Sequence, residues 1–263
     1  DTIHSRDYRN SASLRPGAVL VVGGGQSGSQ IAEDLHLAGR KVFWSLSDRP
    51  SNIRWLYGKD FMEWWDIGGI LHRHVKDIPD VKTGQPDALR KARSTEFPLV
   101  SGNGGDGLGH SISLLTLSES GIVLLGKLRS VQDEIAYFDN MLPQIQRAIA
   151  GTQKEHAMLS KIAQTYYEGK DIPLPAEGCF VPPEVSSKRL PTQLLSKLNF
   201  GVTGISTVIF ATGYRSEWSW LHVPNILDEF GYPLGENGIS PVEGLYFLGM
   251  FNLQRLSSTC LCN

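Results

Sequence analysis

The sequence predicts an α/β fold built on a parallel β-sheet, and three observations support this. An apolar, β-branched run at 18–22 has the composition of a strand that is buried on both faces. A glycine-rich turn follows at 23–28, and apolar residues then recur at helical spacing over 31–38. A second apolar run at 41–47 completes a strand–turn–helix–strand unit of about 30 residues, the usual building block of parallel sheets.

Composition places the chain among ordinary globular proteins. Its 263 residues are 41% hydrophobic and 20% charged, which suits one large domain or two small ones and excludes collagen-like, coiled-coil and disordered chains. The net charge of −2 argues against a nucleic-acid partner. No apolar run approaches the roughly 20 residues of a membrane helix, so no membrane partner is expected. Three cysteines are too few for a disulfide framework, so we expect a reducing, cytoplasmic location.

Later elements are predicted from the same kinds of pattern. The irregular stretch over 48–109 is expected to hold a short helix and a packed loop around its tryptophans. Apolar residues at i, i+3 and i+4 predict a long helix over 140–168, with Pro143 in its first turn and Gly151 as a point where it can divide. Further short strands are expected within 121–137, 207–211 and 244–249.

The glycine-rich turn matches the pattern G-x-G-x-x-G through Gly23, Gly25 and Gly28. In a dinucleotide-binding turn the first glycine permits a tight bend, the second lets the main chain approach a diphosphate, and the third lets the helix pack close to the strand. Main-chain N–H groups at the start of the helix then face the phosphates, aided by the helix dipole. The sequence therefore predicts a Rossmann-like nucleotide site. A flexible glycine turn without a ligand is the alternative.

The end of the second strand indicates which nucleotide is bound. An acidic residue there binds the ribose 2′-OH of NAD, whereas arginine suits the 2′-phosphate of NADP. The sequence has both, in Asp48 and Arg49, and the hydroxyls of Ser45 and Ser47 can donate to a phosphate. We favour NADP, bound by Ser47 and Arg49, and NAD is the alternative.

Several motifs resemble the flavin-containing monooxygenase superfamily, which includes Baeyer–Villiger and N-hydroxylating monooxygenases. His4 and Tyr8 match the last two fixed positions of its fingerprint F-x-G-x-x-x-H-x-x-x-[YFW], whose first two precede residue 1. The glycine loop follows in the expected place. Residues 210–214, Phe-Ala-Thr-Gly-Tyr, resemble the family's [FL]-A-T-G-[YF] element, and 244–250 resemble its closing flavin-domain strand. These motifs occur in the family's order and cover nearly the whole chain.

The resemblance implies two dinucleotide-binding domains, with the NADP-binding domain inserted into the FAD-binding domain. In this chain 1–13 would be an FAD-domain or linker segment, 14–214 the NADP-binding domain, and 215–263 an incomplete C-terminal FAD-domain segment. The FAD domain's own glycine loop would precede Asp1, and the sequence has one such strand–loop–helix unit. We therefore expect part of a longer gene product, which by itself binds FAD poorly.

The resemblance also implies a chemistry. NADPH reduces FAD, O₂ adds to give a C4a-hydroperoxyflavin, and this species oxygenates a small organic substrate. The flavin carries the reaction, so we assign no catalytic residue. No metal site is predicted either, because His72 and His74 lack an evident third ligand.

The predicted cofactor contacts come from two sources. The glycine loop and the second strand supply Gly23, Gly24, Gly25, Gln26, Ser27, Gly28, Ser47 and Arg49. The resemblance implies His4, Ala211, Thr212, Gly213, Tyr214, Gly249 and Met250.

Two other functions stay open: a flavin-dependent pyridine-nucleotide oxidoreductase without oxygenation, and a non-catalytic nucleotide-binding domain. The expected partners are a small-molecule substrate and O₂, with a separate FAD-domain segment or a second copy of the chain as further candidates. A bound flavin and O₂ consumption driven by NADPH would distinguish the three functions.

Overall fold

The chain divides into two compact units. The computed structural model describes residues 1–46, 53–84, 88, 101–102, 109–178, 181–185, 195–214, 217–228, 231–235 and 238–249. The first unit consists of Asp1–Phe61 and Pro98–Gly213, and the second of Met62–Phe97 and Tyr214–Asn263. The predicted strand–turn–helix–strand unit belongs to the first.

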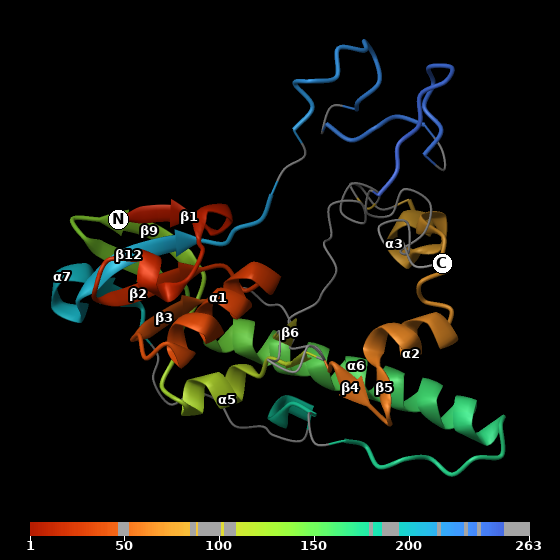
Figure 1. The fold of residues 1–263 in the computed structure, drawn as a ribbon, viewed down its shortest axis with the longest axis horizontal. Coiled ribbons are helices and arrows are strands. Elements are labelled where there is room, and N and C mark those ends of the chain that lie inside the picture. Colours follow the sequence, from red (N-terminus) through yellow and green to blue (C-terminus); the bar gives the residue numbers. More distant parts are fainter. Residues whose placement is uncertain are drawn as a thin grey trace. The chain divides into compact units, whose positions relative to one another are not determined.

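A parallel sheet forms the centre of the first unit (Figure 1). Among the described residues its five strands lie in the order β1 (Thr2–His4), β12 (Ile205–Phe210), β2 (Ala18–Val22), β3 (Val42–Ser45) and β8 (Val123–Leu125). Every neighbouring pair is parallel. Strand β2 leads through α1 (Gln26–Leu37) to β3. The predicted parallel α/β fold is therefore confirmed.

Strand β2 is buried along its whole length because each face of the sheet has its own cover. Val19 and Val21 belong to a core that includes Ile31 and Leu35 of α1. Leu20 belongs to a second core on the opposite face, as the alternation of side chains along a strand requires. The apolar run in the sequence is thus that of a central strand with two buried faces.

A small antiparallel sheet covers the second face of the parallel sheet. Its strands have the order β11 (Lys197–Asn199), β10 (Ile135–Phe138) and β9 (Leu128–Gln132). Ala136, Phe138 and Leu198 pack in the same core as the second face of β2. Together with β8, these strands confirm the short strands predicted within 121–137.

Apart from the long helix α6 (Leu142–Glu168), the remaining described helices and strands of the first unit are short. They are η1 (Ser5–Asp7), η2 (Ser11–Ser13), β4 (Trp55–Leu56), β5 (Lys59–Asp60), β6 (Ser101–Gly102), β7 (His110–Ser111), α5 (Leu114–Glu119), η4 (Pro183–Val185) and α7 (Phe200–Thr203). Helix α2 (Phe61–Ile67) begins where the two units divide and confirms the short helix predicted among the tryptophans.

Helix α6 (Leu142–Glu168) confirms the predicted long helix and runs through Gly151 without a break. Pro143 lies in its first turn, where the missing N–H is not needed. A glycine inside a helix costs about 1 kcal/mol relative to alanine. Ile145 and Ala148 are buried in the core beside α1, and this packing outweighs the cost.

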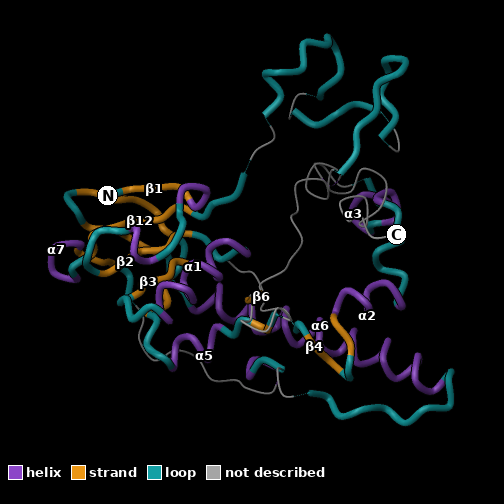
Figure 2. The backbone as a smooth tube through the Cα atoms, viewed as in Figure 1, coloured by secondary structure: helices purple, strands orange, loops and turns teal. Residues whose placement is uncertain are grey.

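The described part of the second unit contains little regular structure. Besides most of α2 it holds η3 (Val75–Asp77) and α3 (Pro79–Lys82). Over 217–249 the described residues form no helix or strand, and their β-structure is limited to isolated bridges. Figure 2 shows the described part of this stretch as loop. The rings of Trp218 and Phe247 meet edge to face within it, with centroids 5.7 Å apart.

The strand predicted at 244–249 is wrong. Gly244 and Gly249 have φ of +81° and +72°, which lie in the left-handed region that no strand uses. Tyr246 makes one isolated bridge, to Ile239. Apolar composition alone therefore misidentified this segment, because the turns at its two glycines exclude an extended ladder.

The predicted assignment of the segments to NADP-binding and FAD-binding domains stays a prediction. The structure adds that β1, within the predicted segment 1–13, pairs with β12 in the parallel sheet. It also groups 62–97 with 214–263. None of the described helices combines the length and the apolar character needed to cross a bilayer.

Candidate nucleotide-binding site

The candidate site lies at the carboxyl-terminal edge of the parallel sheet, between β2 and β12. Val22 ends β2 and lies beside Phe210, which ends β12. After β2 the chain adds β3 and β8 on one side, whereas β12 and β1 lie on the other. The strand order therefore changes direction between β2 and β12. In open α/β sheets, ligands bind in the crevice at such a switch point.

Gly23 makes a tight bend directly after β2. Its φ of +126° lies in the region that favours glycine. A Cβ at this position would lie 2.2 Å from the carbonyl oxygen of Ala211. The main-chain N–H of Ala211 donates to the carbonyl of Val22 at 2.7 Å. The segment after β12 therefore lies directly against the glycine loop, and a side chain at position 23 would separate the two.

The other two glycines of the motif differ in their surroundings. A Cβ on Gly28 would lie 2.0 Å from the carbonyl oxygen of Gly23, so this glycine lets the first turn of α1 pack against the bend. A Cβ on Gly25 would meet no atom within 4 Å, and its φ of −83° is accessible to any residue. Packing therefore explains Gly23 and Gly28 but not Gly25, whose missing side chain leaves open space at the start of the helix.

Helix α1 begins after Gly25 without a side-chain cap. The main-chain N–H of Ser29 donates to the carbonyl of Gly25 at 3.0 Å and closes the first turn. First-turn N–H groups have no acceptor within their own helix, and the helix dipole adds partial positive charge there. The first turn contains no acidic residue. This end of α1 is therefore suited to an anion.

Strand β3 supports the loop from its other side. The N–H of Gly23 donates to the carbonyl of Ser45 at 3.0 Å, and the indole N–H of Trp44 donates to the carbonyl of Gly23 at 2.9 Å. The hydroxyl of buried Ser45 donates to the carbonyl of Gly126 at 2.9 Å and accepts from the N–H of Leu128 at 3.2 Å. The expectation that Ser45 donates to a phosphate is wrong, because this hydroxyl ties β3 to the start of β9.

The indole of Trp44 was not among the predicted contacts of the loop. Trp44 is completely buried, as a tryptophan with a purely packing role would be. Its hydrogen-bond acceptor lies 21 residues earlier in the chain. A tryptophan on the strand that follows a glycine loop and its helix is the only sign of this contact in the sequence.

Two further predicted segments reach the same edge of the sheet. His4 ends β1 and is aligned with Phe210, and its Nδ1 accepts the N–H of Arg6 at 3.2 Å. After β12 the chain passes through exposed Thr212 and through Gly213, whose φ is +98°. The edge therefore gathers His4, 23–28 and 211–213. Whether these residues contact a cofactor stays a prediction.

Tyr8 connects the N-terminal segment to α1. Its hydroxyl donates to the carboxylate of Asp34. Burial raises the pKa of Tyr8, and the hydrogen bond to Asp34 raises it further. Tyr8 therefore stays protonated and acts as a donor, which ties the segment that carries His4 to the helix behind the glycine loop.

The remaining predicted contacts fall outside the described residues or belong to the second unit. Ser47, Arg49 and Met250 fall outside the described residues, so the preference for NADP stays a prediction. Tyr214 and Gly249 belong to the second unit. The side chain of Tyr214 is 60% exposed, and Gly249 has positive φ with open space where a Cβ would be.

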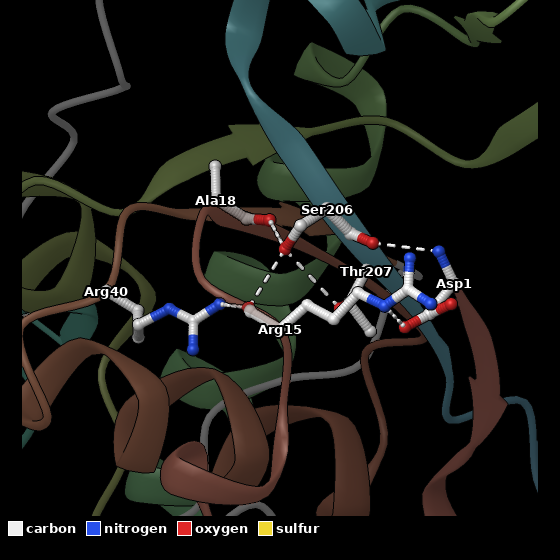
Figure 3. Close-up of polar contacts among 6 residues, drawn as sticks. All are labelled: Asp1, Arg15, Ala18, Arg40, Ser206 and Thr207. Atoms are coloured by element: carbon white, nitrogen blue, oxygen red, sulfur yellow. Dashed lines mark hydrogen bonds and ion pairs between the residues drawn. The ribbon is translucent and has the colours of Figure 1, made fainter.

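A basic cluster at the amino-terminal edge of the sheet has a structural role (Figure 3). The guanidinium group of Arg40 donates to the main-chain carbonyl of Arg15 at 2.6 Å, as Figure 3 shows, and also to that of Gly17 at 2.9 Å. The hydroxyl of Ser206 donates to the same Arg15 carbonyl at 3.1 Å, and the Arg15 side chain pairs with Asp1 at 2.7 Å. These cations therefore hold the entry to β2 and are not directed at the glycine loop.

A parallel sheet with a glycine-rich bend at its switch point and an uncapped helix start behind it is the arrangement of dinucleotide-binding α/β proteins. No protein-family model matches the chain. It is similar to the curated "Uncharacterized oxidoreductase CzcO-like" of Geobacillus kaustophilus, with 26% identity over 253 residues. It is also similar to the "Uncharacterized oxidoreductase CzcO" of Bacillus subtilis and of Bacillus velezensis, with 24% and 27% identity over 249 residues.

Each of these matches covers 94% of this chain, and the chain spans about half the length of the curated relatives it matches. A mutant flavin monooxygenase from Stenotrophomonas maltophilia is similar in structure, over 98% of this chain and 51% of that one, with 12% identity and a TM-score of 0.44. The chain is thus a relative of proteins named as oxidoreductases over nearly all of its length.

Proposed function

We propose that this chain is the NADP-binding part of a flavoprotein monooxygenase that uses NADPH and FAD. The observation that carries the proposal is the open, uncapped start of α1 at the switch point of the parallel sheet. The relationship with oxidoreductases and the motifs that resemble the monooxygenase superfamily support it.

The diphosphate of the nucleotide would lie against main-chain N–H groups at the start of α1. The dipole of α1 stabilises negative charge there, and no acidic side chain in the first turn opposes it. Gly25 leaves room for a phosphate, because a Cβ there would extend into open space. The segment 211–213 borders this position on the β12 side, since Ala211 packs against Gly23.

The remaining predicted contacts have more specific roles in the proposal. Ser47 and Arg49 would select NADP by binding its 2′-phosphate, since a guanidinium group pairs with phosphate through two parallel hydrogen bonds. His4 and 212–214 would contact the cofactors at the ends of their strands. Gly249 and Met250 would approach the flavin.

When bound, the cofactors would supply the redox chemistry, namely the transfer of reducing equivalents from NADPH to FAD and of one oxygen atom from O₂ to a small organic substrate. The residues of this chain bind and orient the nucleotide, and we assign none of them a proton transfer. Because the chain spans about half the length of its relatives, oxygenation would be an activity of the whole protein.

Gly25→Val tests the glycine loop directly. We expect this variant to lower the affinity for NADPH at least about ten-fold, because a branched side chain would occupy the space of a phosphate. Its melting temperature should fall by no more than a few degrees, because the backbone and the surroundings of Gly25 accept a side chain and valine is merely a weaker N-cap than glycine. Calorimetric titration measures the affinity, and thermal unfolding measures the stability.

Gly201→Val is the matched control, because it adds the same side chain in α7, where a Cβ makes an ordinary 3.5 Å contact with the Asn199 side chain. This control should bind NADPH as the wild type does. Undiminished affinity in Gly25→Val, or a wild-type chain that binds no NADPH, would contradict the proposal.

In the full-length protein, NADPH-driven O₂ consumption is expected. NADPH oxidation without O₂ consumption would favour a reductase. Nucleotide binding without any turnover would favour a non-catalytic domain.

A further inference from the structure

Strand β3 contributes a tryptophan that is completely buried and yet hydrogen-bonded to the glycine loop. Trp44 has no exposed surface, and its indole N–H donates to the carbonyl of Gly23 at 2.9 Å. In the parallel register Trp44 lies beside Val21 of β2, and both belong to the core on the α1 face. The indole therefore reaches the bend from within the core and joins the sheet to the first residue of the candidate site.

We propose that Trp44 is a positioning residue for nucleotide binding. Its indole N–H holds the carbonyl of Gly23 and thereby directs the N–H of Gly24 away from the core. This inference rests on the proposed function, because it concerns the loop that would bind the diphosphate.

The planarity of the peptide bond carries the first step. In a trans peptide the carbonyl and the following N–H point in opposite directions. Because the indole of Trp44 holds the carbonyl of Gly23, the N–H of Gly24 points away from the indole. A donor directed away from the core at the turn between strand and helix is what an anion at this position requires.

The other features of the bend described above do not hold the carbonyl of Gly23. The N–H of Gly23 donates to the carbonyl of Ser45 at 3.0 Å, which fixes the preceding peptide but not the following one. Gly28 merely leaves room for the Gly23 carbonyl, since a Cβ there would lie 2.0 Å from its oxygen. Trp44 thus holds the carbonyl of the peptide between positions 23 and 24 from the core side.

The indole is suited to this role by its chemistry. An indole N–H is a donor only, and a buried one needs an acceptor. A phenylalanine or leucine would fill much of the same core volume without offering a donor. The acceptor here is a carbonyl of the loop rather than another group of the core, so the hydrogen bond serves the conformation of the loop.

Trp44→Phe and Trp55→Phe form a matched pair of variants. Trp55 also donates from its indole to a main-chain carbonyl, that of Gly109 at 3.2 Å, in the same unit but away from the glycine loop. Each substitution therefore removes one indole–carbonyl hydrogen bond and leaves a phenyl ring. We expect Trp44→Phe to weaken NADPH binding about ten-fold, the effect of one lost hydrogen bond, and Trp55→Phe to change it less than about two-fold.

The amide signal of Gly24 gives a readout that does not depend on the nucleotide. In spectra of chain labelled with ¹⁵N-glycine, this signal should move in Trp44→Phe and stay in place in Trp55→Phe. A variant with benzothienylalanine at position 44, which keeps the shape of the ring and lacks the N–H, carries the same test if the phenylalanine variant does not fold.

The outcomes separate this inference from the proposed function. A shifted Gly24 signal together with weakened NADPH binding, in the position-44 variants alone, would support the inference. An unmoved Gly24 signal, or equal losses of affinity in the variants at positions 44 and 55, would overturn it. A wild-type chain that binds no NADPH would instead overturn the proposed function. The Gly24 signal would still report whether Trp44 orients the peptide between Gly23 and Gly24.

Discussion

At the scale of single residues, the glycines of one motif serve different purposes. The sequence pattern treats Gly23, Gly25 and Gly28 alike, but a side chain has no room at the first and third and has open space at the second. Gly23 and Gly28 are therefore explained by the packing of the bend between Ala211 and α1. Gly25 is the position at which the absence of a side chain has a consequence for a ligand rather than for the fold.

Gly28→Ala should lower the free energy of unfolding by about 1–3 kcal/mol, because the new Cβ would overlap the Gly23 carbonyl and displace main chain. Urea denaturation measures the loss. Gly25→Ala is its matched control and should cost at most about 1 kcal/mol, since alanine is merely a weaker N-cap than glycine. Equal losses in the two variants would contradict the packing role assigned to Gly28.

At the scale of elements, α6 carries a carboxyl group that is poorly suited to its surroundings. The Oε1 atom of Glu155 is buried and has no hydrogen-bond partner among the described residues. Burial disfavours the charged form and raises the pKa of Glu155 to about 8. The packing of the helix therefore keeps this carboxyl group neutral at neutral pH, whereas in the unfolded chain it ionises near pH 4.5.

The stability of the protein should consequently fall as the pH rises. Between the two pKa values the folded state binds one proton more than the unfolded state. The stability that the neutral Glu155 side chain contributes is therefore fully present below pH 4.5 and is lost as the pH rises through about 8. One pKa unit corresponds to about 1.4 kcal/mol, so the whole change amounts to a few kcal/mol. Urea denaturation at pH 5, 7 and 9 measures this dependence.

Glu155→Gln should flatten that dependence, because the amide stays neutral at every pH. Glu168→Gln, which changes an exposed residue at the end of the same helix, is the control and should keep the wild-type slope. A Glu155→Gln variant with an unchanged slope would show that another group causes the pH dependence.

At the scale of the whole molecule, local patterns predict the elements better than they predict the partners of those elements. The strand–loop–helix–strand unit and α6 follow from periodicity and turn residues, because each depends on residues close together in the chain. The pairing of β1 with β12, and the antiparallel sheet that includes β11, join segments far apart in sequence. No local pattern specifies such pairings.

The same reason limits prediction of the site. The glycine motif identifies the bend after β2, and the packing of Ala211 against it agrees with a site between two strand ends. The hydrogen bonds of Trp44 to Gly23 and of Ser45 to Gly126 span 21 and 81 residues. The hydrogen bond of Trp44 joins a core side chain to the candidate site. The hydrogen bond of Ser45 occupies a hydroxyl that was expected to contact a phosphate.

The most direct measurement for the central claim is a crystal structure of the chain soaked with NADPH. We expect the diphosphate oxygens within about 3 Å of main-chain nitrogens over 24–28, with the phosphates beside Gly25 and the segment 211–213 along their other side. A nucleotide bound at another place, or nitrogens over 24–28 that contact only solvent while the nucleotide is present, would contradict the account.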